Sequence, residues 1–273
     1  MNIFSEQAGS ASALKILQIT DMHLFEDPNS TLLGVNTEQS FLATLEKAKS
    51  ESWPPDLIFF TGDISQDSTE AAYTRLIEHI SPLNIPCYTL PGNHDIPQIL
   101  SATLNKPPLF SQAFLHTENW LFAFLDSATP NEEGGTLKDH EVVALEKEIQ
   151  QHPDKNVLIC LHHQVIEVGS EWLDTMLTVN TSSLFDLMKN TPAIKGIIHG
   201  HAHQEFESII GSIPIWGCPS TCFQFAPHSK EFALGNEAPG YRWLKLTDNG
   251  KIETAVVRLD EALTSLEKTA TGY

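Results

Sequence analysis

The sequence LKILQITDMH, residues 14–23, joins a short aliphatic run to two side chains of the metal-binding type. Residues 14–20 are rich in Leu and Ile and are bounded by polar residues, which predicts a buried β-strand. Asp21 and His23 follow that strand directly. The same arrangement, an apolar run that ends in Asp, Asn or His, recurs farther along the chain.

Short apolar runs alternate with helical patterns over the first two hundred residues. Strands that are apolar throughout and alternate with helices indicate a sheet covered on both faces. We predict one helix to begin with a capping-box-like pair, Asp67 and Glu70. The other predicted elements are strands at 56–61, 86–90, 119–127, 156–161 and 194–198, and helices at 37–50 and 138–151.

The last third of the chain has a different pattern. Residues 208–218 place a Gly211 turn between apolar segments, and residues 241–247 and 251–259 flank the hairpin turn Asp248-Asn249-Gly250. These features predict antiparallel β-structure. We therefore expect a single α/β domain over residues 14–260, built as two sheets between helical layers. The termini, 1–13 and 261–273, are expected to be loosely ordered.

Charge and composition restrict the partners and the compartment. The 273 residues carry 16 basic and 35 acidic side chains, a net charge of -19. Such a surface repels phosphate backbones, so we expect no nucleic-acid binding, although bound cations would still admit a small anion. No apolar run approaches about 18 residues, the first residues lack a signal-peptide pattern, and four cysteines are too few for a disulfide scaffold. We expect a cytoplasmic protein without membrane association, and no pattern indicates its oligomeric state.

Five predicted strands are each followed by polar segments of related composition. Each segment alone is typical of an ordinary turn. Because the carboxyl ends of strands meet at one edge of an α/β sheet, we expect the five to lie together. Polar groups clustered beside a core cost stability unless they are paired or coordinated, so the set predicts a metal centre. The segments are Asp21-Met-His23, Gly62-Asp63, Gly92-Asn93-His94-Asp95, His162-His163 and His199-Gly-His201-Ala-His203.

The number and type of donors indicate the kind of centre. Seven nitrogen and oxygen donors without a thiolate exceed the needs of one tetrahedral zinc ion. They suit Fe or Mn, with Zn or Co as alternatives, in two five- or six-coordinate sites that share a carboxylate. Two-metal sites serve phosphate-ester chemistry because the cations hold the phosphoryl oxygens and activate water. The candidate ligands are Asp21, His23, Asp63, Asn93, His162, His201 and His203.

The blocks D-M-H, G-D, G-N-H-D, H and G-H-A-H, over about residues 15–205, resemble those of the calcineurin-like metallophosphoesterases. The resemblance implies a four-layer αββα sandwich of two mixed β-sheets flanked by helices. It implies that Asp63 bridges two divalent metal ions and that His94 contacts the phosphate and protonates or stabilises the leaving oxygen; these two are the candidate catalytic residues. The first metal would be held by Asp21, His23, Asp63 and His203, and the second by Asp63, Asn93, His162 and His201.

The same resemblance implies contacts to the substrate from His23, Asp63, Asn93, His94, His162 and His203. Residues beside these have alternative interpretations. Asp95 either orients His94 or belongs to a surface turn. His163 is expected to support its neighbour or face solvent, and His199 to be a hydrogen-bonded structural histidine. Phe223 and Phe225 either stack on a nucleobase or pack in the core.

A closer similarity is to the class III 3',5'-cyclic-nucleotide phosphodiesterases. It is carried by ILQITDMHLF (16–25), LLGVNT (32–37), PSTCFQFAPH (219–228), APGYR (238–242) and the terminal GY. This similarity implies hydrolysis of 3',5'-cyclic AMP to 5'-AMP, which would lower cyclic AMP signalling. The chain departs from the pattern at Gln164-Val165, where a histidine and a proline are expected; this changes a loop beside the second metal without removing a ligand.

Two alternatives to cyclic AMP hydrolysis remain at this stage. The first keeps the chemistry and changes the substrate to another cyclic nucleotide, a glycerophosphodiester or a phosphomonoester, since the ligands contact only phosphate. The second is a non-catalytic scaffold of the same fold. A scaffold predicts substitutions among the seven donors, and none is present.

Overall fold

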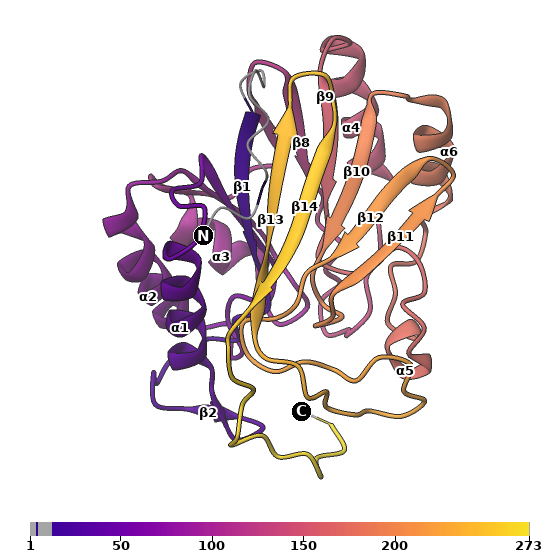
Figure 1. Ribbon diagram of the computed structural model, residues 1–273. Helices are drawn as coiled ribbons and strands as arrows, with labels where there is room; N and C mark the ends of the chain where they lie inside the picture. Colours follow the sequence, from indigo (N-terminus) through magenta and orange to yellow (C-terminus); the bar gives the residue numbers. More distant parts are fainter. Residues whose placement is uncertain (1–3, 5–12, 273) are drawn as a thin grey trace.

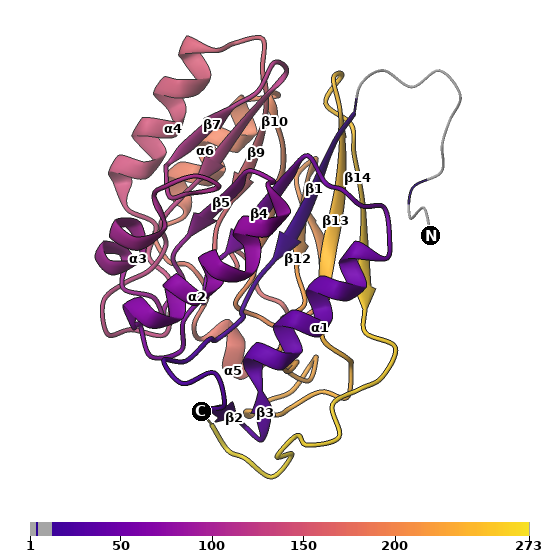
Figure 2. The same ribbon diagram turned by 90° about the vertical axis from the view of Figure 1, so that its left-hand side faces the viewer.

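The computed structural model describes Phe4 and residues 13–272. Two six-stranded sheets lie face to face, in the orders β14-β13-β1-β4-β5-β6 and β11-β12-β10-β9-β8-β7. Helices cover the outer face of each sheet (Figure 1, Figure 2). The expected four-layer sandwich of mixed sheets is therefore confirmed. The loose N-terminus that we predicted lies almost wholly outside the described residues.

The first sheet and its helices are built mainly from the N-terminal half of the chain. Its strands are β1 (Ala13–Ile19), β4 (Leu57–Thr61), β5 (Cys87–Leu90), β6 (Leu109–Phe110), β13 (Gly240–Thr247) and β14 (Ile252–Arg258). The covering helices are α1 (Thr37–Lys49), α2 (Glu70–Ile80) and α3 (Pro97–Leu104), with a 3₁₀ turn, η1 (Ser81–Leu83). Apolar side chains of all three helices pack on β1 and β4 in one core cluster.

The second sheet is built from the following part of the chain. Its strands are β7 (Phe114–His116), β8 (Trp120–Phe124), β9 (Asn156–Cys160), β10 (Ile194–His199), β11 (Phe206–Ile210) and β12 (Ile213–Gly217). Helices α4 (Asp139–Gln151) and α6 (Ser182–Asn190) pack on its outer face. The remaining elements are the short helix α5 (Glu171–Asp174) and the small pair β2 (Thr31–Leu32) and β3 (Val35–Asn36).

Two local predictions differ from the structure. Helix α2 is capped by Thr69, whose side chain accepts a hydrogen bond from the Ala72 amide, whereas Asp67 accepts bonds from Thr69 and Glu26 before the helix begins. The predicted antiparallel character of the last third holds for the β11–β12 and β13–β14 hairpins. It is wrong for the pairing of β12 with β10, which is parallel: β12 lies between β11 and β10 in the sheet and is antiparallel only to β11.

The C-terminal segment after β14 runs along the lower end of the sandwich, past β2 (Figure 1). Leu263 and Leu266 pack against a core cluster that contains Phe223 and Phe225. The Glu267 amide donates a hydrogen bond to the Leu33 carbonyl at 3.0 Å. This segment therefore contacts the same end of the molecule as the strand-end loops, and the domain limit at residue 260 stays a prediction. Among the described residues, no helix has both the length and the hydropathy needed to cross a membrane.

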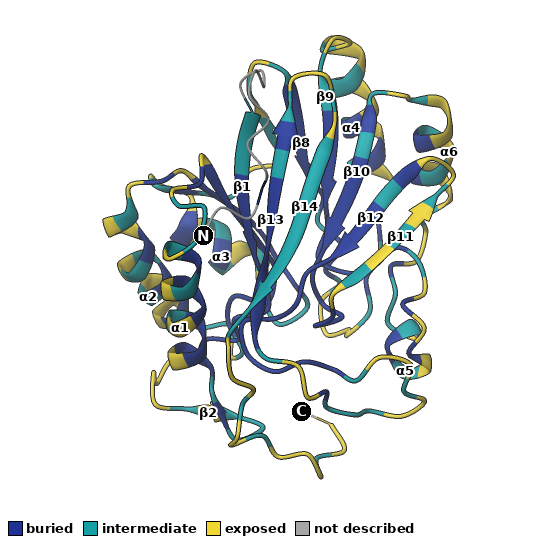
Figure 3. Cartoon of the chain, viewed as in Figure 1, coloured by how far each residue is buried: buried dark blue, intermediate teal, exposed yellow. Residues whose placement is uncertain are grey.

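The two sheets are held together by an apolar layer between their inner faces. The strands that line it are buried, whereas the helices are exposed on their outer sides (Figure 3). Phe59 of β4 lies at the centre of this layer, with ring centroids 5.1 Å from Phe122 and 5.0 Å from Phe124 in edge-to-face geometry. Such aromatic pairs add to the free energy gained by burial alone.

We predict that Phe59→Ala lowers the free energy of unfolding by about 3–5 kcal/mol, because it leaves a cavity between the two sheets. Val143→Ala is the matched control: Val143 is 64% exposed on α4, so its truncation should change stability by less than about 0.5 kcal/mol. Urea unfolding followed by circular dichroism measures both. Equal stabilities for the two variants would contradict the central role assigned to this layer.

Candidate metal centre

Five loops bring the seven candidate donors together at one end of the sandwich. Loops after β1, β4 and β5 of the first sheet carry Asp21, His23, Asp63 and Asn93. Loops after β9 and β10 of the second sheet carry His162, His201 and His203. All of these side chains except Asn93 are buried. The expected convergence is thus observed, although the donors come from the edges of two sheets rather than one.

The backbone of these loops is held in an unusual conformation. Asp21, His23, Asp63, His201 and His203 all have positive φ, between 47° and 57°. This left-handed region is uncommon for residues other than glycine, and occupying it costs about 1–3 kcal/mol for each residue. Five such residues in one cluster indicate that the surrounding contacts impose the arrangement.

Neighbouring glycines leave room for the donors to approach one another. Gly62 has φ of 97°, and a Cβ at that position would lie 2.2 Å from Nδ1 of His162. A Cβ on Gly92 would lie 2.1 Å from Oδ1 of Asp63. Neither position accepts a side chain without displacing a donor.

Hydrogen bonds on the outer side of the histidine rings fix their tautomers. Nδ1 of His162 lies 2.8 Å from the Thr61 carbonyl, and Nδ1 of His203 lies 2.8 Å from the Phe223 carbonyl. A carbonyl oxygen only accepts, so in both rings Nδ1 carries a proton, and the lone pair of the neutral ring is on Nε2. Nδ1 of His23 is held in the same way, 2.7 Å from Oε1 of Gln66.

The lone pairs therefore point toward one another and toward the carboxylates. Nε2 of His23 and Nε2 of His203 are 3.2 Å apart, and Oδ2 of Asp63 is 3.3 Å from Nε2 of His162 and 3.8 Å from Nε2 of His23. The buried Nε2 of His201 has no hydrogen-bond partner among the described residues. Acceptors that face acceptors in a buried space repel unless a cation lies between them, so these residues fit a divalent metal centre.

The electrostatics of the cluster favour positive charge. Burial raises the pKa of Asp63, but His162, His94 and His23 outweigh burial and hold that pKa well below its usual range. Burial likewise lowers the pKa of His162, but Asp63, Asp21 and the Thr61 carbonyl outweigh it and raise the pKa to about 9. Burial dominates at His23, whose pKa falls to about 3. A proton on His162 thus occupies the space between the carboxylates when no cation does.

Asp95 ties two of the donor loops together. Its carboxylate accepts hydrogen bonds from the amides of Gly92, Ile64 and Ser65, at 2.9, 3.2 and 3.1 Å, and from the Tyr73 hydroxyl at 2.9 Å. The side chain is buried, so the interpretation as a surface turn is wrong. Asp95 fixes the Asp63 loop against the Asn93 loop.

The other neighbouring residues are also accounted for. His163 is buried, with Nδ1 2.9 Å from the Ser127 hydroxyl and Nε2 3.1 Å from the Glu133 carbonyl, so it does not face solvent. His199 is a hydrogen-bonded structural histidine, as expected: its Nδ1 lies 2.9 Å from the Gly200 carbonyl. All four cysteines are buried free thiols.

A cavity of about 270 Å³ opens beside the cluster. Asn93, His94 and His201 line its inner end. The other residues expected to contact substrate, His23, Asp63, His162 and His203, are buried and are not among its lining residues. Contact between these four residues and a substrate stays a prediction.

Several contributing groups carry no signal in the sequence. The carbonyls of Thr61 and Phe223 are backbone groups, and any residue supplies one. Trp172 and Phe232 line the cavity from segments far from the donor motifs. Gln66 is the exception, because it lies three residues after Asp63, and its polar side chain near a predicted ligand could have identified it.

Comparison with known proteins gives the class of the protein. The calcineurin-like phosphoesterase family matches residues 14–205, a range that contains all seven donors and both sheets' donor loops. The chain belongs to this family, and the resemblance seen in its motifs is confirmed.

Individual relatives cover nearly the whole chain. It is 38% identical to the 3',5'-cyclic adenosine monophosphate phosphodiesterase CpdA of Vibrio vulnificus over 97% of each protein. The Pseudomonas aeruginosa protein of the same name is 34% identical over 100% of each. The 3',5'-cyclic-nucleotide phosphodiesterase alr5338 of Nostoc sp. is 34% identical over 94% of this chain and 97% of its own length.

Solved structures share the fold at much lower identity. A dimetal phosphatase from Danio rerio superimposes with a TM-score of 0.61 at 14% identity, covering 90% of this chain and 98% of that one. GAP50, the anchor in the inner membrane complex of Plasmodium, gives a TM-score of 0.60 at 13% identity, covering 92% and 86%. These likenesses concern the fold alone.

We predict that Asp95→Asn loosens the metal centre. Its amide nitrogen would face backbone N–H donors, and losing those bonds should lower the free energy of unfolding by about 1–3 kcal/mol. Metal content after dialysis should fall below that of the unmodified protein. Asp154→Asn, at an exposed position, is the matched control and should change neither quantity. A fully loaded Asp95→Asn protein of normal stability would refute the role assigned to Asp95.

We also predict that metal binding releases a proton. In the metal-free protein the pKa of His162 is raised to about 9, so the ring is protonated at pH 7 and must lose that proton to coordinate. Apparent metal affinity should therefore increase with pH up to about pH 9. Calorimetric titration in buffers of different ionisation enthalpy measures the protons released. Heats that do not depend on the buffer would contradict this prediction.

Proposed function

We propose that this protein hydrolyses 3',5'-cyclic AMP to 5'-AMP at a centre of two divalent metal ions, iron or manganese in preference to zinc or cobalt. The observation that carries the proposal is the convergence of seven nitrogen and oxygen donors beside His94 at the end of a cavity. The names of the relatives from Vibrio vulnificus and Pseudomonas aeruginosa support cyclic AMP as the substrate.

The donors divide into two groups around Asp63. Its Oδ2 lies between Nε2 of His23 and Nε2 of His162, which supports a bridging role. When bound, the cations would neutralise charge on the phosphoryl oxygens and lower the pKa of the attacking water. We assign Asp21, His23, Asp63 and His203 to one ion, and Asp63, Asn93, His162 and His201 to the other.

His94 is placed to act on the leaving group. Its amide donates a 2.9 Å hydrogen bond to Oδ1 of Asp63, and its ring lies 5.0 Å from the ring of His23 and lines the cavity. In the proposed reaction, a water molecule gives up a proton to solvent as its oxygen bonds to phosphorus, and the bond from phosphorus to the 3' oxygen breaks. His94 supplies the proton that the 3' oxygen takes up and regains one from solvent. General acid catalysis of this kind contributes about 10²–10⁴-fold.

The charge of the centre favours a small anionic substrate. Two divalent cations outweigh the carboxylates Asp21 and Asp63, so the centre is positive within a chain whose net charge is -19. The positive centre would attract a cyclic phosphodiester, whereas the negative charge of the rest of the chain disfavours binding of long nucleic acids. We place the enzyme in the cytoplasm; its four unpaired thiols are compatible with a reducing compartment.

A wider substrate range is the second candidate. The donors contact phosphate rather than the base, and one relative is named as a 3',5'-cyclic-nucleotide phosphodiesterase without a specified base. A panel of cyclic AMP, other cyclic nucleotides, a glycerophosphodiester and a phosphomonoester separates the two candidates.

The decisive experiment is product analysis after metal-reconstituted protein is incubated with cyclic AMP. We predict that the unmodified protein forms 5'-AMP and that Asp63→Ala forms none and retains fewer metal ions. Formation of 3'-AMP would refute the proposed direction of cleavage. No product from protein with two verified metal ions would refute cyclic AMP as the substrate.

The role assigned to His94 predicts that a His94 variant differs from Asp63→Ala in its metal content. His94→Gln should keep its full metal content and lower kcat by about 10²–10⁴-fold, since the side chain donates a proton and does not bind metal. Metal analysis and steady-state kinetics on the same preparation measure both. Loss of metal from His94→Gln would show that the assignment of His94 is wrong.

A further inference from the structure

We propose that the outer wall of the cavity beside His94 binds the nucleobase of the substrate, and that Trp172 is the surface on which the base stacks. The inference rests on the proposed function, because it assigns the part of a cyclic nucleotide that the metal centre does not contact. It names residues that lie outside the donor motifs.

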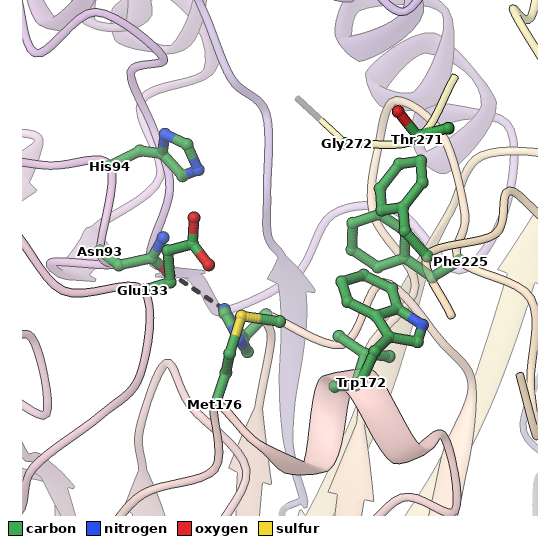
Figure 4. Close-up of a pocket in the computed structure, with 11 residues that line it drawn as sticks. Asn93, His94, Glu133, Trp172, Met176, Phe225, Thr271 and Gly272 are labelled. Atoms are coloured by element: carbon green, nitrogen blue, oxygen red, sulfur yellow. Dashed lines mark hydrogen bonds between the residues drawn. The ribbon is translucent and has the colours of Figure 1, made fainter. Parts of the chain in front are cut away.

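The cavity has two chemically different ends. Figure 4 shows Asn93 and His94 on one side of it and Trp172 and Phe225 on the other, with Thr271 and Gly272 at the rim. Phosphate would bind at the metal end, and the opposite end is aromatic: Trp172, Phe225 and Phe232 all line it. A nucleotide has the same division between an anionic phosphate and an uncharged aromatic base.

The aromatic wall is rigid, and Trp172 is the member of it on which the proposed stacking depends. Trp172 packs edge-to-face on Phe225, with centroids 4.8 Å apart, and lies 5.2 Å from Phe232. Its indole N–H donates to the Ser229 hydroxyl at 2.9 Å, so its one polar group is satisfied. Phe225 is buried, whereas Trp172 and Phe232 stay partly exposed. The part of Trp172 that faces the cavity is therefore available for stacking.

The wall adjoins the metal centre directly. Phe225 stacks on the ring of His203, with centroids 4.5 Å apart and an interplanar angle of 28°. Phe225 therefore contacts both His203 of the cluster and Trp172. We place the ribose between a base on Trp172 and a phosphate beside Asn93 and His94, since these residues line the same cavity from opposite sides (Figure 4).

Gln164, where the chain departs from the family pattern, holds the short helix that carries Trp172. Gln164 is buried, and its Nε2 donates to the Leu173 carbonyl of α5 at 2.9 Å. Asp174 accepts hydrogen bonds from the amides of Val168 and Gly169 and closes the preceding turn. The short helix that carries Trp172 is therefore fixed before substrate binds, and Gln164 acts as a positioning residue.

The charge of the residues that line the cavity favours an uncharged base over a second anionic group of the substrate. Among the described residues that line the cavity, none is Lys or Arg, and the one carboxylate is that of Glu133. A glycerophosphate or sugar-phosphate group would find no cation at this end. An aromatic base would find π-faces, and stacking on an aromatic side chain is tolerant of base identity.

The test is direct binding to metal-reconstituted protein, with 5'-AMP and ribose 5-phosphate as paired probes that differ only in the base. We expect the unmodified protein to bind 5'-AMP at least about tenfold more tightly than ribose 5-phosphate. Trp172→Ala should reduce that preference by about tenfold without changing the affinity for ribose 5-phosphate. Trp172→Phe should restore most of it.

Controls separate this inference from folding and from the proposed function. Trp53→Phe, at a partly buried position that packs against the core of the first sheet, should leave both affinities unchanged. Thermal unfolding of each variant identifies a folding defect, and Trp172→Phe keeps the test informative if Trp172→Ala is unstable. Equal weakening of both probes, or no change for 5'-AMP, overturns the inference. Because binding is measured without turnover, a protein that fails to hydrolyse cyclic AMP refutes the proposed function and leaves this test intact.

Discussion

The hydrogen bonds made by Nδ1 of the donor histidines constrain the rest of this structure. The carbonyls of Thr61 and Phe223 can only accept, so the lone pairs of His162 and His203 have to point inward, toward the carboxylates of Asp21 and Asp63. With neutral rings this arrangement is unfavourable for the protein alone, because it concentrates acceptors in a buried space. A cation turns the same geometry into a favourable one, and the energy of metal binding then offsets strain in the donor loops.

The fold supplies the rigidity that this constraint needs. Each donor loop leaves a strand whose apolar residues are packed on both faces, and Asp95 joins two of the loops by hydrogen bonds. Small movements of a loop would therefore have to disturb a core cluster. This explains how residues with positive φ can persist at five positions in one site. The cavity beside them is lined in part by exposed residues, Thr271 and Gly272.

The features that could be predicted from the sequence are those marked by a short pattern of neighbouring residues. The strands and the donor segments were predictable because each pairs a continuous apolar run with polar residues directly after it. Helices α3 and α6 were not predicted, since eight- and nine-residue helices give few turns of periodicity. The aromatic wall joins residues 172, 225 and 232, which no spacing rule connects. The burial of Asp95 was equally hidden, because its partners are mainly backbone amides of another loop.

The pairing of β1 with β13 has a consequence for how the protein is made. Strand β1 lies between β4 and β13 in the first sheet, so one of its two edges is completed by Gly240–Thr247, near the end of the described chain. During synthesis the ribosome delivers β1 and the candidate ligand Asp21 that follows it long before that partner exists. An open strand edge of this kind is a site for mispairing and aggregation. The nascent protein therefore spends most of its translation with an unpaired strand edge, and stalled or truncated chains would be clients for chaperones and proteases.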